Sequence, residues 1–240
     1  MNMNEASRGY RSLVLGATGL VGSALLQQLL ADPQCKAVTV LVRRPLRPSP
    51  DMQGYGNKLT VLTADLDRMD EALTGVEVDT VFCALGTTIK KAGSQEAFRV
   101  VDLEYPIALG EWAKAHGASK YIVVSAMGAN AASSIFYNRV KGEMEARLTE
   151  MGLPELHILR PSLLLGKREE FRLGEKAAIL LSPLMKLLMV GRLRMYRPVQ
   201  ATAVAAKMVK CAQAKRAAAD GRTITQIYEN DAITATMIEE

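Results

Sequence analysis

The chain has 240 residues, of which 49% are hydrophobic, and a formal net charge of +5. This length suits one large α/β domain with a substantial core, so we expect a single domain over residues 1–240. Lysine and arginine are scattered along the chain and aromatic residues make up only 5%, which argues against a nucleic-acid-binding surface.

The first predicted element is a strand that turns directly into a helix. Residues 12–22 read SLVLGATGLVG, and apolar residues then recur at helical spacing up to about residue 32. The glycines suit a tight turn, the approach of a phosphate to the backbone and close helix packing, and the helix dipole attracts an anion. The turn therefore predicts a pyrophosphate site for a dinucleotide. Its residues are Gly16, Thr18, Gly19, Leu20, Val21 and Gly22.

The second predicted strand, residues 37–42, ends in two arginines. It reads AVTVLV, an apolar run typical of a strand buried on both faces of a parallel sheet. An NAD-specific site has an acidic residue at about this distance from the glycines, whereas Arg43 and Arg44 suit a 2′-phosphate. We therefore predict NADP rather than NAD as the cofactor. The alternative is that both arginines only solvate the end of the strand.

A third strand is predicted at residues 59–63. Asp65 and Leu66 follow it, and Asp65 suits the N-cap of a helix over residues 67–73.

The fourth predicted strand, residues 80–85, leads into a segment of small residues. Ala84, Leu85 and Gly86 lie where the ribose and nicotinamide of a cofactor can rest against the backbone. Residues 89–93 are expected to form a flap over the cofactor.

A helix over residues 94–116 is predicted next, bent or split near Pro106 because proline disrupts a helix. A fifth strand over residues 121–124 follows and ends at Ser125.

Tyr137 and Lys141 lie four positions apart on the next predicted helix, so both side chains share one face. An ammonium beside a phenol stabilises the phenolate and lowers a pKa that is about 10 in the free side chain. The tyrosine can then exchange a proton near neutral pH, while Ser125 orients a substrate carbonyl by hydrogen bonding. The alternative is a solvated helix face with a core tyrosine.

The last third of the chain is predicted to add a strand at residues 156–159, a helix at 201–214 and a strand at 223–228. Asn230 is expected to cap a final helical segment. Residues 166–200 are basic and rich in methionine, which suits a small substrate lobe.

Together these motifs resemble those of the atypical short-chain dehydrogenase/reductases. The segments FCALGTTIKKAGSQEAFRVVD and FYNRVKGEMEARL are similar in particular to the HIV Tat-interacting-protein group of that superfamily, and the resemblance covers about residues 11–213. It implies an α/β fold, with a doubly wound, mainly parallel Rossmann sheet of about seven strands and a small C-terminal substrate lobe.

The resemblance also implies roles for single residues. Tyr137 is expected to be the acid/base, Lys141 the modifier of its pKa and the anchor of the nicotinamide ribose, and Ser125 the substrate-orienting hydroxyl. Asp65 is expected to bond the adenine amino group, and Pro161 to line the nicotinamide.

Two positions depart from the superfamily's pattern. Asp102 lies near the place where many members have an asparagine for a proton relay, which puts the relay in question. Ala126 stands where many relatives have a serine, so Ser133 and Ser134 are alternatives to Ser125 as the orienting hydroxyl.

The predicted function is an NADP-dependent oxidoreductase that transfers hydride between the nicotinamide and a carbonyl or alcohol substrate. The alternative is an NADP(H)-binding sensor or regulatory protein with little or no turnover, which implies a protein partner. We expect a small carbonyl or alcohol as the ligand and a monomer or homodimer. Neither a metal ion, nor nucleic acid, nor a membrane is expected to bind.

The cysteines and apolar segments bear on the location of the protein. Cys35, Cys83 and Cys211 are far apart and lack metal-ligand spacing, so we expect reduced thiols. The first twelve residues lack the apolar core of a signal peptide, and the apolar stretch 177–190 is too short to span a bilayer. We therefore expect a cytoplasmic protein.

Overall fold

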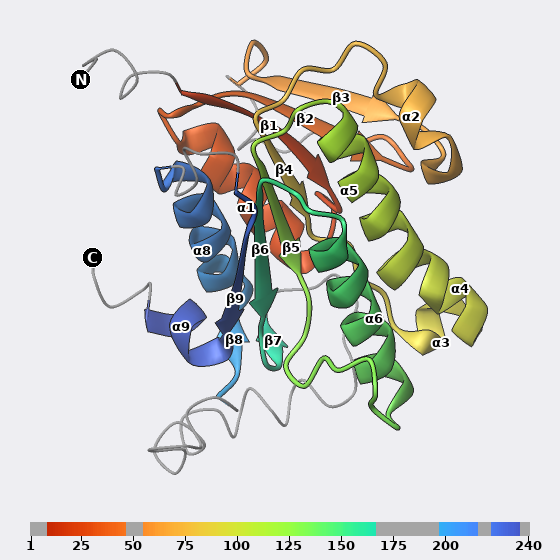
Figure 1. Cartoon of the computed structure of the whole chain (residues 1–240). Helices are drawn as coiled ribbons and strands as arrows, with labels where there is room; N and C mark the ends of the chain where they lie inside the picture. The colour runs from red at the N-terminus through yellow and green to blue at the C-terminus, as the bar shows by residue number, and fades with distance from the viewer. Residues whose placement is uncertain (1–8, 47–54, 167–196, 216–221, 236–240) are drawn as a thin grey trace.

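The computed structural model describes residues 9–46, 55–166, 197–215 and 222–235, and its centre is a parallel sheet. The strands of this sheet are β1 (Tyr10–Leu15), β2 (Cys35–Val42), β3 (Leu59–Thr63), β4 (Thr80–Cys83), β5 (Lys120–Val124), β6 (Glu155–Arg160) and β9 (Ile224–Glu229). Their order is β3-β2-β1-β4-β5-β6-β9, and each neighbouring pair is parallel (Figure 1). The order runs outward in both directions from β1 and β4, so the predicted doubly wound sheet of seven strands is confirmed.

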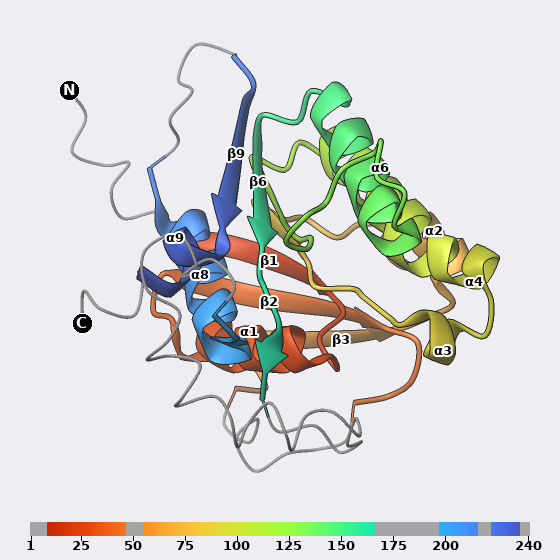
Figure 2. The same cartoon turned by 90° about the horizontal axis from the view of Figure 1, so that it is seen from below.

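Helices cover both faces of the sheet (Figures 1 and 2). One face carries α1 (Leu20–Ala31), α8 (Ala201–Gln213) and α9 (Asn230–Thr234), and the other carries α2 (Met69–Ala72), α5 (Tyr105–Ala115) and α6 (Phe136–Glu150). Successive residues of β1 enter different cores, because side chains of a strand alternate between its faces. Val14 joins the core beneath α1 and α8, whereas Leu13 and Leu15 join the core beneath α5 and α6.

The helix predicted over residues 94–116 forms as three consecutive segments. These are α4 (Gln95–Arg99), a π-helical segment (Val100–Glu104) and α5, which has Pro106 in its first turn. Glu104 and Tyr105 keep right-handed helical angles and the Tyr105 N–H donates to the Val100 carbonyl, so α5 continues the π-helical segment directly. The split predicted near Pro106 therefore takes the form of a change from π- to α-helix at Tyr105, and the π-helical segment turns Asp102 and Leu103 into the interior.

The segment expected as a flap contains a helical turn, α3 (Ile89–Ala92), because the Thr88 hydroxyl accepts the Lys91 N–H at 3.2 Å and caps it. One expectation about local structure was wrong. The Asn230 side chain does not cap α9. It instead accepts the Ser162 N–H at 3.0 Å and donates to the Arg197 carbonyl at 2.8 Å, because it is fully buried between those segments.

The predicted substrate lobe, residues 166–200, lies mostly outside the described residues, as does the apolar stretch 177–190. At the edges of that gap, β7 (Leu164–Leu165) pairs in parallel with β8 (Val199–Gln200). Among the helices of the described ranges, none combines the length and the apolar character that a membrane span requires.

Candidate active site

The turn between β1 and α1 has room only for glycine at two positions. Gly16 has a φ of +92°, and a Cβ added there would lie 2.6 Å from the Ala84 carbonyl carbon at the end of β4. A Cβ added to Gly22 would lie 2.0 Å from the Gly16 carbonyl oxygen. Any side chain would therefore push the helix away from the turn, or the turn away from β4.

The start of α1 is suited to an anion. Its N-cap residue is Gly19, which has no side chain to bond the first N–H groups, and the first turn carries no acidic residue. These N–H groups can therefore donate to a bound anion, which the positive end of the helix dipole also attracts. The turn opens onto a cavity of about 730 Å³, which falls within the usual range for small-molecule sites. The residues present thus fit the pyrophosphate of a dinucleotide.

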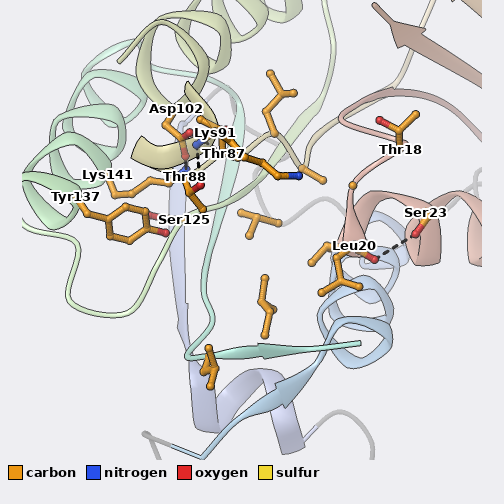
Figure 3. Close-up of a pocket in the computed structure, with 18 of the residues that line it drawn as sticks. Thr18, Leu20, Ser23, Thr87, Thr88, Lys91, Asp102, Ser125, Tyr137 and Lys141 are labelled. Atoms are coloured by element: carbon orange, nitrogen blue, oxygen red, sulfur yellow. Dashed lines mark hydrogen bonds and ion pairs between the residues drawn. The ribbon is translucent and has the colours of Figure 1, made fainter. Parts of the chain in front are cut away.

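The cavity lies along the C-terminal ends of β1, β4 and β5, where ligands bind in open α/β sheets (Figure 3). Lys91 on α3 and Asp102 on the π-helical segment also line it, and neither was predicted as a cofactor-binding or catalytic residue. The sequence-predicted residues that line this cavity are Thr18, Gly19, Leu20, Val21, Ala84, Leu85, Gly86, Ser125, Tyr137 and Lys141.

Other predicted cofactor residues are not among those that line this cavity. Gly16 and Gly22 shape the turn behind it, and Arg43 and Arg44 are exposed just beyond the end of β2. The remaining three are Asp65 and Leu66, which follow β3, and Pro161, which follows β6. Asp65 is exposed, and its carboxylate accepts the Asp67 N–H at 3.2 Å, so it caps the 3₁₀ turn Leu66–Arg68. Leu66 is buried.

Tyr137 and Lys141 project from the start of α6 toward the cavity (Figure 3). Tyr137 lies in the first turn with 37% of its surface exposed, and its ring packs against Phe98 with the centroids 5.8 Å apart. Lys141 follows one turn later and is only 2% exposed. The phenol is thus open to a ligand, whereas the ammonium lies deep in the wall.

Lys141 is paired with a buried carboxylate. Its Nζ lies 2.8 Å from Asp102 Oδ1, and Asp102 Oδ2 accepts the Thr87 N–H at 2.9 Å. Burial lowers the pKa of Lys141, but the negative charge of Asp102 and the nearby Tyr137 outweigh it, so the pKa lies above its usual value. Lys141 therefore keeps its proton at neutral pH. In the sequence, the signal for this partner was that Asp102 is flanked on both sides by apolar residues, Val101 and Leu103.

Ser125 also has a buried carboxylate as its partner. Its hydroxyl donates to Glu145, and Glu145 in turn accepts hydrogen bonds from the Arg160 guanidinium, from Nη2 at 2.5 Å and from Nε at 3.1 Å. Arg160 also meets Glu229 at 2.9 Å. The hydrogen of Ser125 is therefore engaged, and its oxygen faces the cavity as an acceptor. Sequence reasoning missed Glu145, although its spacing from Tyr137 and Lys141 in steps of four was a usable signal.

The two alternative serines lie elsewhere. Ser133 accepts the Ile135 N–H at 3.2 Å, and Ser134 is exposed at the surface before α6. Within the described ranges, Ser125 is the one of these three serines on the wall of the cavity.

A second, smaller cavity of about 180 Å³ adjoins the hydroxyls of Ser125 and Tyr137. Apart from these groups and Ser162, its wall is apolar. Its apolar residues are Ala126, Met127, Pro161 and Leu164.

The family comparison matches most of the chain. A family model described as NAD(P)H-binding covers residues 16–177. Protein FMP52, mitochondrial, from Candida albicans is 38% identical over 162 residues, covering 66% of this chain and 69% of that protein. Protein HTATIP2 from Rattus norvegicus is 38% identical over 162 residues, covering 68% of this chain and 66% of that protein. The matched part thus spans about two thirds of these relatives.

Solved structures show the same fold at low identity. MoeE5 in complex with UDP-glucose and NAD has a TM-score of 0.65 and 15% identity, over 95% of this chain and 81% of that one. The ADP-L-glycero-D-manno-heptose-6-epimerase of Helicobacter pylori has a TM-score of 0.65 and 19% identity, over 100% of this chain and 85% of that one. At such identities the likeness extends to the fold alone.

The comparisons correct one expectation. We expected a cytoplasmic protein, but the FMP52 relatives from Candida albicans, Debaryomyces hansenii, Eremothecium gossypii and Emericella nidulans are all named as mitochondrial proteins. The expectation rested on the lack of a signal peptide and on three free cysteines, neither of which separates these compartments.

Proposed function

Because this chain belongs to the NAD(P)H-binding family, in the group of FMP52 and HTATIP2, we propose that it is an NADP-dependent oxidoreductase acting on a carbonyl or alcohol. The observation that carries the proposal is the meeting of Ser125, Tyr137 and Lys141 on the wall of one cavity, opposite the β1–α1 turn. Ser125 follows β5, whereas Tyr137 and Lys141 lie on α6. If Tyr137 and Lys141 only formed a solvated helix face, there would be no reason for them to share the wall of a cavity with a serine from another element.

The chain would hold the cofactor from three sides. The N–H groups at the start of α1 bind the pyrophosphate, the guanidinium groups of Arg43 and Arg44 bind the 2′-phosphate, and Lys141 holds the nicotinamide ribose. When bound, the cofactor supplies or accepts a hydride at its nicotinamide ring.

Tyr137 would move the proton. During reduction its hydroxyl donates a proton to the carbonyl oxygen, and during oxidation the phenolate takes a proton from the alcohol. The Lys141 ammonium favours the phenolate in either direction, and the carboxylate of Asp102 beside it offsets part of that effect. Ser125 accepts a hydrogen bond from the substrate alcohol as it stands, and it must release Glu145 to donate one to a carbonyl.

The smaller cavity bears on the substrate. It adjoins both hydroxyls, and no charged side chain of the described residues lines it. A charged substituent placed there would lose its hydration without gaining a partner. We therefore propose that the substrate carries a compact apolar group next to its carbonyl carbon.

The test measures NADPH binding and NADPH oxidation with a panel of aldehydes and ketones. Tyr137→Phe is expected to reduce turnover by about 100-fold or more while leaving NADPH affinity within about twofold, because it removes only the transferred proton. Tyr55→Phe is the matched control, since Tyr55 precedes β3 at the opposite end of the sheet. Unchanged turnover in Tyr137→Phe would contradict the proposal.

The second candidate function is an NADP(H)-binding sensor with little turnover. It is favoured by the interactions that Ser125 and Lys141 already make within the protein. The Ser125 hydroxyl donates its hydrogen to Glu145, and Asp102 balances the charge of Lys141. Tight NADPH binding that Tyr137→Phe does not alter, together with no turnover on the whole panel, would support the sensor.

A further inference from the structure

The ion pair between Lys141 and Asp102 weakens the effect of the lysine charge on the ionisation of Tyr137. A lone ammonium beside a phenol favours the phenolate, but an ammonium 2.8 Å from a carboxylate belongs to a pair with no net charge. Both members are buried, with Asp102 1% and Lys141 2% exposed, so water screens the pair little.

Asp102 is also a structural anchor. Its second carboxylate oxygen accepts the Thr87 N–H at 2.9 Å, so one side chain connects the segment after β4 with the lysine on α6. An asparagine at this position keeps an oxygen for the Thr87 N–H but carries no charge. The charge and the anchor are therefore separable by one substitution.

Building on the proposed function, we propose that Asp102 is a positioning residue that keeps Tyr137 in its phenol form by neutralising Lys141. Reduction of a carbonyl needs the phenol as its proton donor, whereas oxidation of an alcohol needs the phenolate as its acceptor. Asp102 therefore extends the reducing direction to higher pH. An uncompensated Lys141 would shift the balance toward the phenolate and toward oxidation.

Several other ionisable groups face this pair. Cys83 on β4 is fully buried, and burial raises the pKa of its thiol, so it stays uncharged. Lys91 on α3 lines the same cavity, and Glu145 lies behind Ser125. None of these groups changes in an Asp102 variant, so their effect on Tyr137 is constant in the comparison.

The test follows the ionisation of Tyr137 directly, by NMR of the full chain with ¹³C-labelled tyrosine rings and without cofactor. The signal is assigned by its loss in Tyr137→Phe. In Asp102→Asn the midpoint of the Tyr137 ionisation is expected to fall by about one pH unit, as expected for removal of one nearby charge at a partly buried site. An unchanged or higher midpoint would overturn the proposal.

Glu104→Gln is the matched control, because Glu104 lies on the same π-helical segment but is exposed. It is expected to leave the midpoint within about 0.2 units, since solvent screens its charge. Asp102→Ser is a second variant in case Asp102→Asn does not fold, and the same fall is expected, with the same outcome overturning the proposal.

The pH dependence of carbonyl reduction gives a second readout. The alkaline limb of the profile is expected to move to lower pH in Asp102→Asn by the same amount as the NMR midpoint. A shifted NMR midpoint in a chain without turnover would contradict the proposed function and leave this inference standing. Turnover with an unshifted midpoint would support the proposed function and contradict this inference.

Discussion

His157 is a buried titratable residue that the proposed chemistry does not use. It lies on β6, where its Nδ1 meets the Tyr228 hydroxyl at 3.1 Å and its Nε2 lies 3.6 Å from Glu155. Burial is the main reason that the pKa of His157 lies below its usual value, opposed by Glu155 and assisted by the positive charges of Lys120 and Lys207. Only 4% of the His157 surface is exposed, so it is a residue of the core.

This lowered pKa predicts a loss of stability in acid. The unfolded chain, with an imidazole pKa of about 6.5, binds a proton more readily than the folded chain, so stability falls as the pH drops below that value. Urea unfolding at pH 7.5 and 5.5 is expected to show a larger loss of unfolding free energy for the wild type than for His157→Gln, with a limiting slope of about 1.4 kcal/mol per pH unit.

His116→Gln is the control for this measurement, because His116 is exposed and its Nδ1 meets the Trp112 carbonyl at 2.9 Å at the end of α5. It is expected to lose as much stability as the wild type. Equal losses in the wild type and His157→Gln would exclude His157 as the source of the acid sensitivity.

The helix α6 is placed by a close approach to the loop that precedes it. A Cβ added to Gly142 would lie 2.1 Å from the Ala131 nitrogen and 2.2 Å from the Asn130 carbonyl carbon. The Asn130 N–H also donates to the Asn138 carbonyl at 3.0 Å, which ties the loop to the helix. Because Gly142 follows Lys141 directly, this contact determines where the helix face that carries Tyr137 and Lys141 lies.

Gly142→Ala is therefore expected to displace α6 as well as destabilise the chain. Backbone atoms cannot rotate out of the way, so a loss of about 1–3 kcal/mol in unfolding free energy is expected, and NADPH affinity should fall because Lys141 moves. Urea unfolding and NADPH titration check both effects.

Gly110→Ala on α5 is a matched comparison. Its added Cβ would lie 2.8 Å from the end of the Leu148 side chain, which can change rotamer. A smaller destabilisation and unchanged NADPH affinity are expected. If Gly142→Ala binds NADPH as tightly as the wild type, the close approach does not position Lys141.

At the scale of the whole molecule, the cofactor would connect the two halves of the sheet. The β1–α1 turn and Arg43 belong to the half that ends at β3, whereas Tyr137 and Lys141 belong to the half that ends at β9. A ligand that needs both halves binds the folded chain and not the unfolded one, so it stabilises the whole domain.

NADPH at 100 times its dissociation constant is therefore expected to add about 2.7 kcal/mol, which raises the melting temperature by roughly 5–10 °C in a domain of this size. Differential scanning calorimetry measures this shift. At one fixed concentration of each cofactor, Arg43→Gln is expected to reduce the shift with NADPH but not with NADH, because only NADPH carries the 2′-phosphate. Equal shifts with the two cofactors at the same concentration in the wild type would contradict the predicted preference for NADP.

The sequence by itself determined the strands, most of the helices and the nucleotide turn. These features depend on neighbours within a few positions: apolar runs for buried strands, spacing of three and four for helices, and glycines where a turn leaves no room for Cβ. Tyr137 and Lys141 were found for the same reason, since four positions along a helix define a shared face.

Only the tertiary structure decided the partners of the proposed catalytic groups. Asp102 meets Lys141 because a π-helical segment on one element packs against α6, and Glu145 meets Ser125 because α6 lies across the end of β5. The sequence placed Asp102 near the relay position and Glu145 on the helix face of Tyr137 and Lys141, but it did not show which groups they contact. Their pairing depends on how separate elements pack, because a charge far along the chain acts on a site only after folding brings it within a few ångströms.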